Sequence, residues 1–298
     1  MKTVLITGAS GLVGSKLSKA LESKGYEVRK LSRQKKDGFY FWNPANYEIE
    51  ESVFNGLDAI IHLAGAPISN RWTDSYKSEL YESRVEVSDL LLKCLRKRNI
   101  ELKTYISASG VNYYGTETTT KIYTESDPVA DDYLGGLCSD WESAAFDFEI
   151  LGTRVCVVRT AVVLSEKGGM LKKLIPAAKL NLVSHLGNGK QIVPWIHIDD
   201  LVNLYIYLLE NPNLNGAFNA VATQRVNSKE FTEIFVKAMN RKLILPGVPA
   251  FLLKLAFGEM ASIMLYGSAV SNQKIKANGF QFKFEKLEDA MKNLLGNS

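Results

Sequence analysis

The sequence predicts an α/β fold in which a doubly wound parallel sheet is joined to a smaller, mostly C-terminal α/β substrate lobe. Residues 4–7 form a short apolar run with almost no polar alternation, which is typical of a parallel strand covered on both faces. Gly8, Gly11 and Gly14 follow it and lead into a helical pattern. The 298 residues, 46% hydrophobic and 23% charged, suffice for such a domain and a second lobe.

The three glycines have the context that a dinucleotide-binding loop requires, with a strand before them and a helix behind. Gly8 permits a tight turn, Gly11 lets backbone approach a pyrophosphate, and Gly14 lets the helix pack closely on the strand. The free N–H groups at the helix start would face the phosphates. We therefore expect a Rossmann-type site, with a merely structural turn as the alternative. The cofactor contacts predicted in this loop are Gly8, Ser10, Gly11, Leu12, Val13 and Gly14.

The end of the second predicted strand, 27–31, carries Ser32 and Arg33, with Lys35 and Lys36 close behind. An acid at this position takes the ribose hydroxyls of NAD and would repel a ribose phosphate. A hydroxyl and positive charge instead favour NADP(H) as the cofactor. The alternative is that Arg33 is a solvated surface charge.

The third strong strand, 58–63, runs into Leu63, Ala64 and Gly65. Small residues at the end of a parallel strand leave room for a ligand against the backbone, so we include these three in the cofactor site. His62 could be catalytic, but its apolar neighbours favour a packed strand residue.

A fourth strand, 104–107, leads to Ser107 and Ser109. A hydroxyl at a strand end can hydrogen-bond a substrate carbonyl or alcohol, although serines also form turns. We expect Ser109 to contact substrate and Ser107 to lie in the cofactor site.

The G-x-x-G-x-x-G spacing resembles that of the extended short-chain dehydrogenase/reductase superfamily, which includes nucleotide-sugar epimerases and dehydratases. This resemblance implies that catalytic members carry a Tyr on one helix and a Lys one turn later. The Tyr moves the proton that accompanies hydride transfer. The matching positions here hold Leu137 or Cys138, then Trp141 or Glu142. The usual pair is therefore missing, and an Asn that helps order such sites is matched by Arg84.

Two motifs indicate a narrower relationship. Leu-Cys-x-x-Trp-Glu from 137 and Ser-Ala-Ser-x-x-x-Tyr-Tyr-Gly from 107 are similar to those of the atypical SDR39U1-type epimerase family, and residues 246–295 resemble its C-terminal DUF1731 module. The resemblance adds Arg159 to the expected cofactor site.

We expect a division into two parts. Residues 1–164 would form the NADP-binding Rossmann domain, to which 191–222 return. Residues 165–298 would form mainly the substrate lobe, including the module at 246–295.

These observations favour an NADP(H)-binding, oxidoreductase-like protein of the epimerase/dehydratase superfamily. Its small-molecule substrate is unidentified, with a nucleotide sugar as one candidate. The alternative is a non-catalytic NADP(H)-binding sensor or assembly protein. The candidate catalytic groups are Ser109, Tyr113 and Cys138.

Composition argues against several other classes. A net charge of +4, scattered along the chain, gives no sign of a nucleic-acid partner. The three cysteines lie far apart and, like the three histidines, lack ligand spacing, so we expect neither disulfides nor a metal.

The apolar stretch 250–265 is interrupted by Lys254 and Glu259, so the sequence predicts no membrane partner and a cytoplasmic protein. We expect a set of apolar residues to form a wall over the substrate pocket, with a membrane or partner surface as the alternative: Phe251, Leu252, Leu255, Phe257, Met260 and Met264. The sequence does not indicate the oligomeric state.

Overall fold

The computed structural model describes residues 2–296 and contains one large sheet. Its strands are β1 (Thr3–Thr7), β2 (Glu27–Ser32), β3 (Tyr40–Asn43), β4 (Glu48–Ile49), β5 (Ala59–His62), β6 (Thr104–Gly110), β8 (Arg154–Thr160) and β11 (Gly216–Ala220). They lie in the order β11-β8-β6-β5-β1-β2-β3-β4, and only the β3–β4 pair is antiparallel. The carboxyl ends of the parallel strands therefore share one edge.

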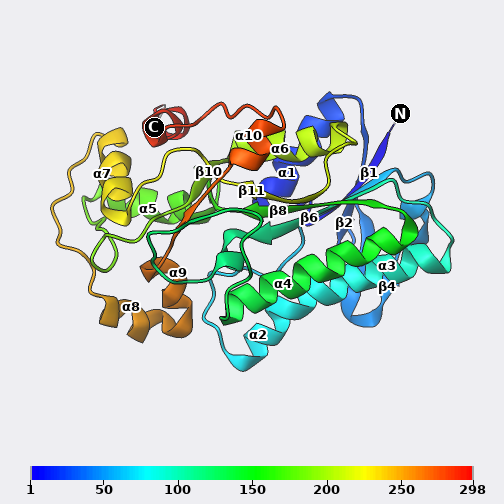
Figure 1. The fold of residues 1–298 in the computed structure, drawn as a ribbon, viewed down its shortest axis with the longest axis horizontal. Helices are drawn as coiled ribbons and strands as arrows, with labels where there is room; N and C mark the ends of the chain where they lie inside the picture. The colour runs from blue at the N-terminus through cyan, green and yellow to red at the C-terminus, as the bar shows by residue number, and fades with distance from the viewer. Residues whose placement is uncertain (1, 297–298) are drawn as a thin grey trace.

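Helices cover both faces of this sheet (Figure 1). On one face lie α1 (Leu12–Ser23) and α6 (Ile198–Glu210); on the other lie α3 (Val87–Lys97) and α4 (Tyr133–Phe146), with α2 (Asp74–Tyr81) beside them. Successive side chains of β1 pack against opposite helix layers, since Val4 and Ile6 belong to one hydrophobic cluster and Leu5 belongs to the other. The predicted doubly wound parallel sheet is confirmed.

The second lobe consists of short elements that follow or interrupt the sheet. They are β7 (Ile122–Tyr123), β9 (Val162–Leu164), α5 (Gly169–Lys179), β10 (Trp195–His197), α7 (Ser228–Ala238), α8 (Ala250–Phe257), α9 (Ser262–Leu265), β12 (Ala269–Val270), α10 (Gln273–Ala277) and α11 (Leu287–Leu295). β9 pairs with β10, and β7 pairs with β12. The domain boundaries given above stay a prediction.

A buried carboxylate in α6 joins the two parts of the chain. Asp200 is fully buried, and it accepts hydrogen bonds from the backbone N–H groups of Lys283 (2.8 Å) and Phe284 (2.9 Å). Burial raises its pKa, although the two N–H donors act in the opposite direction. Asp200 therefore fixes the segment before α11 against α6.

The expectation that these residues form one covering wall is wrong for four of the six. Phe251, Leu252, Leu255 and Phe257 are 67%, 45%, 76% and 36% exposed. The reason is that α8 has only eight residues and packs through Leu253, whose cluster includes Ala261 of the following turn.

The carboxyl end of β5 is fastened to β1 by a small hydrogen-bond network. The Thr7 hydroxyl accepts the N–H groups of Leu63 and Ala64, both at 3.1 Å. Its own hydrogen is then donated to Nδ1 of His62, 2.7 Å away. His62 is fully buried, and burial lowers its pKa to about 4, so the ring is neutral and its proton lies on Nε2. His62 thus holds the end of β5.

This burial predicts a pH dependence of stability. The folded-state pKa of His62, about 4, lies below the unfolded value of about 6.5, so its stabilising contribution is present above pH 6.5 and is lost as the pH falls toward 4. His62→Asn keeps an acceptor for Thr7 without the titration. Between pH 7 and pH 4 the natural protein should lose about 3 kcal/mol more unfolding free energy than the variant in urea titrations. His197, whose pKa is also lowered, is present in both proteins. Parallel losses would contradict this role for His62.

Candidate functional site

The loop after β1 forms a cradle that requires glycine at two positions. Gly8 has φ +66°, and a Cβ there would lie 2.7 Å from the Leu63 carbonyl oxygen. A Cβ at Gly14 would lie 2.3 Å from the oxygen of Gly8, which accounts for the close packing of α1 on the loop. At Gly11 a Cβ would meet only that same oxygen, at 3.2 Å, so this side of the loop is open. The cradle therefore fits the approach of a phosphate to the backbone.

Gly11 is also the N-cap of α1, and no side chain caps this helix. The N–H groups of its first turn are consequently available to an anion, as a dinucleotide site needs. Leu12 and Val13 are half-buried there, and Ser10 is exposed.

The neighbouring strand β2 ends beside this cradle, because its residues pair in parallel with those of β1. Ser32 accepts a hydrogen bond from the Gln34 N–H at 3.1 Å, which shapes a turn there. Arg33 is exposed, and residues 31–36 contain no acid. Arg33 forms no ion pair within residues 2–296, so the edge of the cradle offers a cation and a hydroxyl, which suits a ribose phosphate.

A buried arginine supports the loop after β5. Arg84 lies in a π-helical turn, Glu82–Glu86, between α2 and α3, and it is 9% exposed. Its guanidinium donates to the carbonyl oxygens of Leu80 (3.1 Å) and Ala66 (2.9 Å) and lies against Gly65, where a Cβ would be 3.1 Å from its Cζ. The same group lies over the Trp141 ring, 5.1 Å from its centroid.

No carboxylate contributes to the pKa of Arg84, which burial lowers. The Ser83 hydroxyl completes the attachment, since it accepts the Ala66 N–H at 2.9 Å. Arg84, at the position where the superfamily resemblance implies an Asn, thus fixes the 64–66 loop through the carbonyl oxygen of Ala66.

The central feature of the site is a buried ion pair between α4 and β8. Nε and Nη2 of Arg159 donate to the two oxygens of Glu142, each at 2.8 Å, and both residues are about 95% buried. Nη1 of Arg159 donates to the Tyr114 hydroxyl at 2.8 Å, which in turn donates to Asn219. Burial alone would lower the pKa of Arg159, but Glu142 raises it above its ordinary value.

This ion pair determines how Ser109 can bind a ligand. The Ser109 hydroxyl donates to Oε1 of Glu142 at 2.7 Å, because an ionised carboxylate can only accept. Ser109 therefore presents lone pairs rather than a hydrogen to any ligand. It can accept from an alcohol O–H, but it cannot donate to a carbonyl while this bond persists.

Cys138 lies one helical turn before Glu142, beside the end of β6. A Cβ at Gly110 would be 3.7 Å from its sulfur. Burial, followed by the charge of Glu142, raises the pKa of the Cys138 thiol to about 12. The thiol is protonated at neutral pH and is not a base there.

The other predicted residues lie nearby with different surroundings. Tyr113 is half-buried, and the Arg159 guanidinium lies 3.4 Å from its ring centroid. Ser107 is fully buried and donates to the Ala108 carbonyl oxygen. Arg159 is engaged with Glu142 rather than free for a phosphate, so its expected cofactor role stays a prediction, as do the roles of Tyr113 and Ser107.

From sequence, Glu142 is the place where an ammonium is missing, and its charge one helical turn from Cys138 is expected to raise the pKa of that thiol, an effect that the structure shows. Its pairing with Arg159 was not anticipated. A usable signal existed, since a carboxylate next to Trp141 and before Ala144 and Ala145 lies on an apolar helix face and needs a buried cation.

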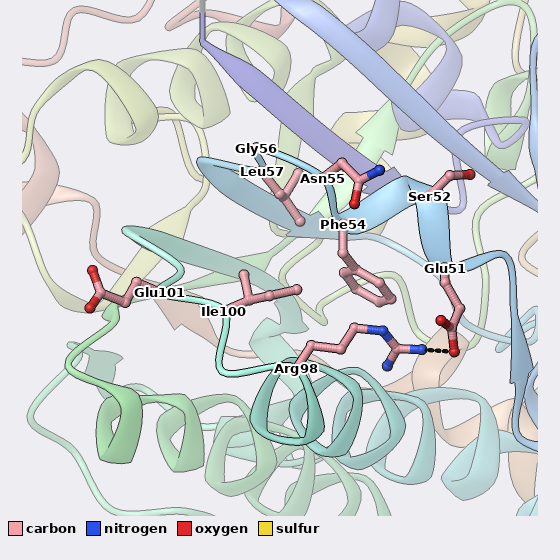
Figure 2. A pocket seen from close by; sticks show the side chains of 9 residues that line it. All are labelled: Glu51, Ser52, Phe54, Asn55, Gly56, Leu57, Arg98, Ile100 and Glu101. Atoms are coloured by element: carbon pink, nitrogen blue, oxygen red, sulfur yellow. Dashed lines mark hydrogen bonds and ion pairs between the residues drawn. The ribbon is translucent and has the colours of Figure 1, made fainter.

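A hollow of about 650 Å³ lies at the opposite edge of the sheet (Figure 2). Its lining comes from the segments before β5 and β6, and Arg98 forms an ion pair with Glu51 at its side. In open α/β sheets ligands bind beyond the carboxyl ends of the strands, so we do not assign this hollow to the site.

Residues 2–296 contain no cluster of three His, Cys, Asp or Glu side chains arranged to hold a metal ion. Within the same range, no helix combines the length and apolarity needed to cross a bilayer.

Comparison with known proteins agrees with this architecture. The sequence profile of the NAD dependent epimerase/dehydratase family matches residues 4–221, and that of DUF1731, a domain of unknown function, matches residues 248–294. The chain is 34% identical over 303 residues to the chloroplastic SDR39U1 homolog of Arabidopsis thaliana, covering 98% of this chain and 86% of the relative.

Among solved structures, the human epimerase family protein SDR39U1 (isoform 2) with NADPH superposes with a TM-score of 0.89 at 31% identity, covering 99% of this chain and all of the other. UDP-glucuronic acid 4-epimerase from Bacillus cereus, with UDP-glucuronic acid and NAD, gives a TM-score of 0.77 at 17% identity, with 99% and 98% covered, and shows the shared fold alone. The chain therefore belongs to the NAD dependent epimerase/dehydratase family, in the SDR39U1-like group that carries a C-terminal DUF1731 domain.

Proposed function

We propose that the protein is an NADP(H)-dependent oxidoreductase that binds a hydroxyl-bearing small molecule at Ser109. The observation that carries this proposal is the buried Ser109–Glu142–Arg159 set. It lies at the carboxyl edge of β6 and β8, at the same edge as the glycine cradle of β1.

The cofactor assignment rests on fit. The open side of Gly11, the uncapped start of α1 and the exposed Arg33 would hold a pyrophosphate and a ribose phosphate. The similar human protein was crystallised with NADPH, which supports the same choice here. When bound, the nicotinamide supplies hydride chemistry.

The chain's own residues would orient the substrate hydroxyl. Ser109 accepts its hydrogen, and Glu142 accepts the hydrogen of Ser109, so both groups are aligned for removal of a proton from an alcohol. Both oxygens of Glu142 already accept hydrogen bonds from Arg159, so this carboxylate is held in a structural ion pair and is not free to contact the substrate directly. We therefore expect slow turnover by the usual epimerase mechanism, which relies on a Tyr–Lys pair. Sugar nucleotides remain one candidate substrate class because of their hydroxyls.

A second candidate function is binding of NADP(H) without turnover, for sensing or assembly. It is favoured by the protonated Cys138 thiol and by the lack of a phenol and an ammonium between Leu137 and Glu142. The experiment that separates the two functions is a search for turnover by protein shown to bind the cofactor.

The first prediction concerns cofactor choice. In calorimetric titrations the protein should bind NADPH more tightly than NADH, because Arg33 and Ser32 would donate hydrogen bonds to the ribose phosphate. Arg33→Ala should weaken NADPH binding by about 1–3 kcal/mol. The affinity for NADH serves as the internal control and should not change. Tighter binding of NADH by the natural protein would refute the assignment.

The second prediction tests the position of the cradle. Gly11→Val should abolish NADPH binding without unfolding the chain, since the side chain would fill the open side where a phosphate approaches. Gly11 has an extended backbone that valine can adopt. Gly136→Val is the matched control, because a Cβ there meets nothing within 4 Å. Normal NADPH binding by Gly11→Val would show that the loop is not the cofactor site.

The third prediction concerns chemistry. UDP-, GDP- and dTDP-sugars incubated with protein and NADP(H) should give little or no cofactor absorbance change or epimer product. Any turnover that is found, with these or with simple alcohols, should fall about 10²-fold or more in Ser109→Ala and be retained in Cys138→Ala. Robust epimerisation by the natural sequence would mean that the acid–base group has been misplaced. Turnover that survives Ser109→Ala would remove Ser109 from the reaction.

A further inference from the structure

Exposed apolar side chains are concentrated at one end of the molecule. Among residues 2–296, more than half of the large apolar side chains that are exposed lie in two segments, 180–182 and 244–257. Six of them are 45–76% exposed: Leu180, Leu182, Ile244, Phe251, Leu252 and Leu255. Together with Lys179, Arg241, Lys242 and Lys254 we call them the basic apolar surface. Scattered single residues would need no explanation, but a gathered set indicates a contact surface.

The two segments are held next to one another by backbone pairing. Val248 donates to the His185 carbonyl oxygen, and Gly187 donates to that of Val248, both at 2.9 Å. The Lys242 N–H donates to Oδ1 of Asn181. Figure 1 shows the chain between α7 and α8 running along the end of the molecule farthest from β1 and β2. The apolar residues therefore belong to one end of the lobe rather than to separate sites.

The stretches of chain that carry these residues contain basic side chains but no acids, and the acids that flank the second stretch, Glu233 and Glu259, form ion pairs with Lys229 and Lys77. Residues 167–198 and 234–258 contain no Asp or Glu. Lys179, Arg241, Lys242 and Lys254 are exposed, and none of them forms an ion pair within the described part of the chain. A face that combines exposed apolar groups with unpaired cations is complementary to a surface that is both anionic and apolar.

A second copy of the chain fits this surface poorly, because a two-fold interface would bring the same cations together without an acid to balance them. We propose instead that the basic apolar surface attaches the protein peripherally to a bilayer containing anionic lipid. Phe251, Leu252 and Leu255 would enter the acyl boundary, and the lysines would face the head groups. The expectation of no membrane partner rested on the lack of a spanning segment and on the interruption of the apolar face by Lys254 and Glu259. Peripheral attachment needs no spanning segment, and it uses Lys254 as one of the cations.

The test is co-sedimentation of the full-length protein with vesicles. Protein should sediment with vesicles of phosphatidylcholine containing about one third phosphatidylserine and only weakly with phosphatidylcholine alone. Phe251→Ser combined with Leu255→Ser should weaken this partitioning about tenfold or more. Ile150→Ser is the matched control, since Ile150 is 67% exposed but lies outside the surface, and it should change nothing.

A charge variant tests the second component. Lys242→Glu combined with Lys254→Glu should reduce binding to anionic vesicles by a similar factor, whereas Lys19→Glu with Lys97→Glu should not. Thermal unfolding and NADPH affinity report whether each variant is folded. The proposal is overturned if the natural protein ignores both vesicle types, or if folded surface variants sediment as well as the natural protein. It is equally overturned if those variants instead dissolve a dimer seen by analytical ultracentrifugation.

Discussion

The arrangement at the carboxyl edge of the sheet depends on the buried ion pair between Glu142 and Arg159. Removing two charges from water costs several kcal/mol for each ion, and the pair is tolerated because two parallel N–H···O bonds and the Ser109 hydroxyl satisfy the carboxylate. A lysine at 142 would face Arg159 without a counter-charge. The site therefore balances the charge of Arg159 with Glu142, where catalytic relatives would have the Lys of the Tyr–Lys pair. Introducing Lys alone at 142 would leave that Lys and Arg159 as two buried cations.

The same ion pair sets the protonation of its neighbours. Glu142 accepts the hydrogen of Ser109 and thereby turns the serine into an acceptor, while its charge adds to the burial that keeps Cys138 protonated. One carboxylate thus makes Ser109 present lone pairs and reinforces the effect of burial, which keeps the thiol protonated. This favours recognition of a hydroxyl over polarisation of a carbonyl.

The features that could be predicted from sequence are those that depend on a short stretch of backbone. The cradle needs only Gly8, Gly11 and Gly14 between a strand and a helix, so local pattern was sufficient. The Glu142–Arg159 pair joins a helix to a strand, and its geometry depends on how α4 lies over β8. The exposure of α8 was missed for a related reason, because an apolar composition does not tell which faces a neighbour covers.

Arg84 shows how a long-range contact supports the local motif. Its cation is compensated by the carbonyl oxygens of Leu80 and Ala66 and by the face of Trp141 rather than by an acid. Carbonyl dipoles are weaker partners than a carboxylate, so holding the guanidinium there costs stability. In return the π-helical turn, α4 and the 64–66 loop are tied to one rigid group. Because Thr7 ties the same loop to β1, the two networks fix it from opposite ends and hold it against Gly8.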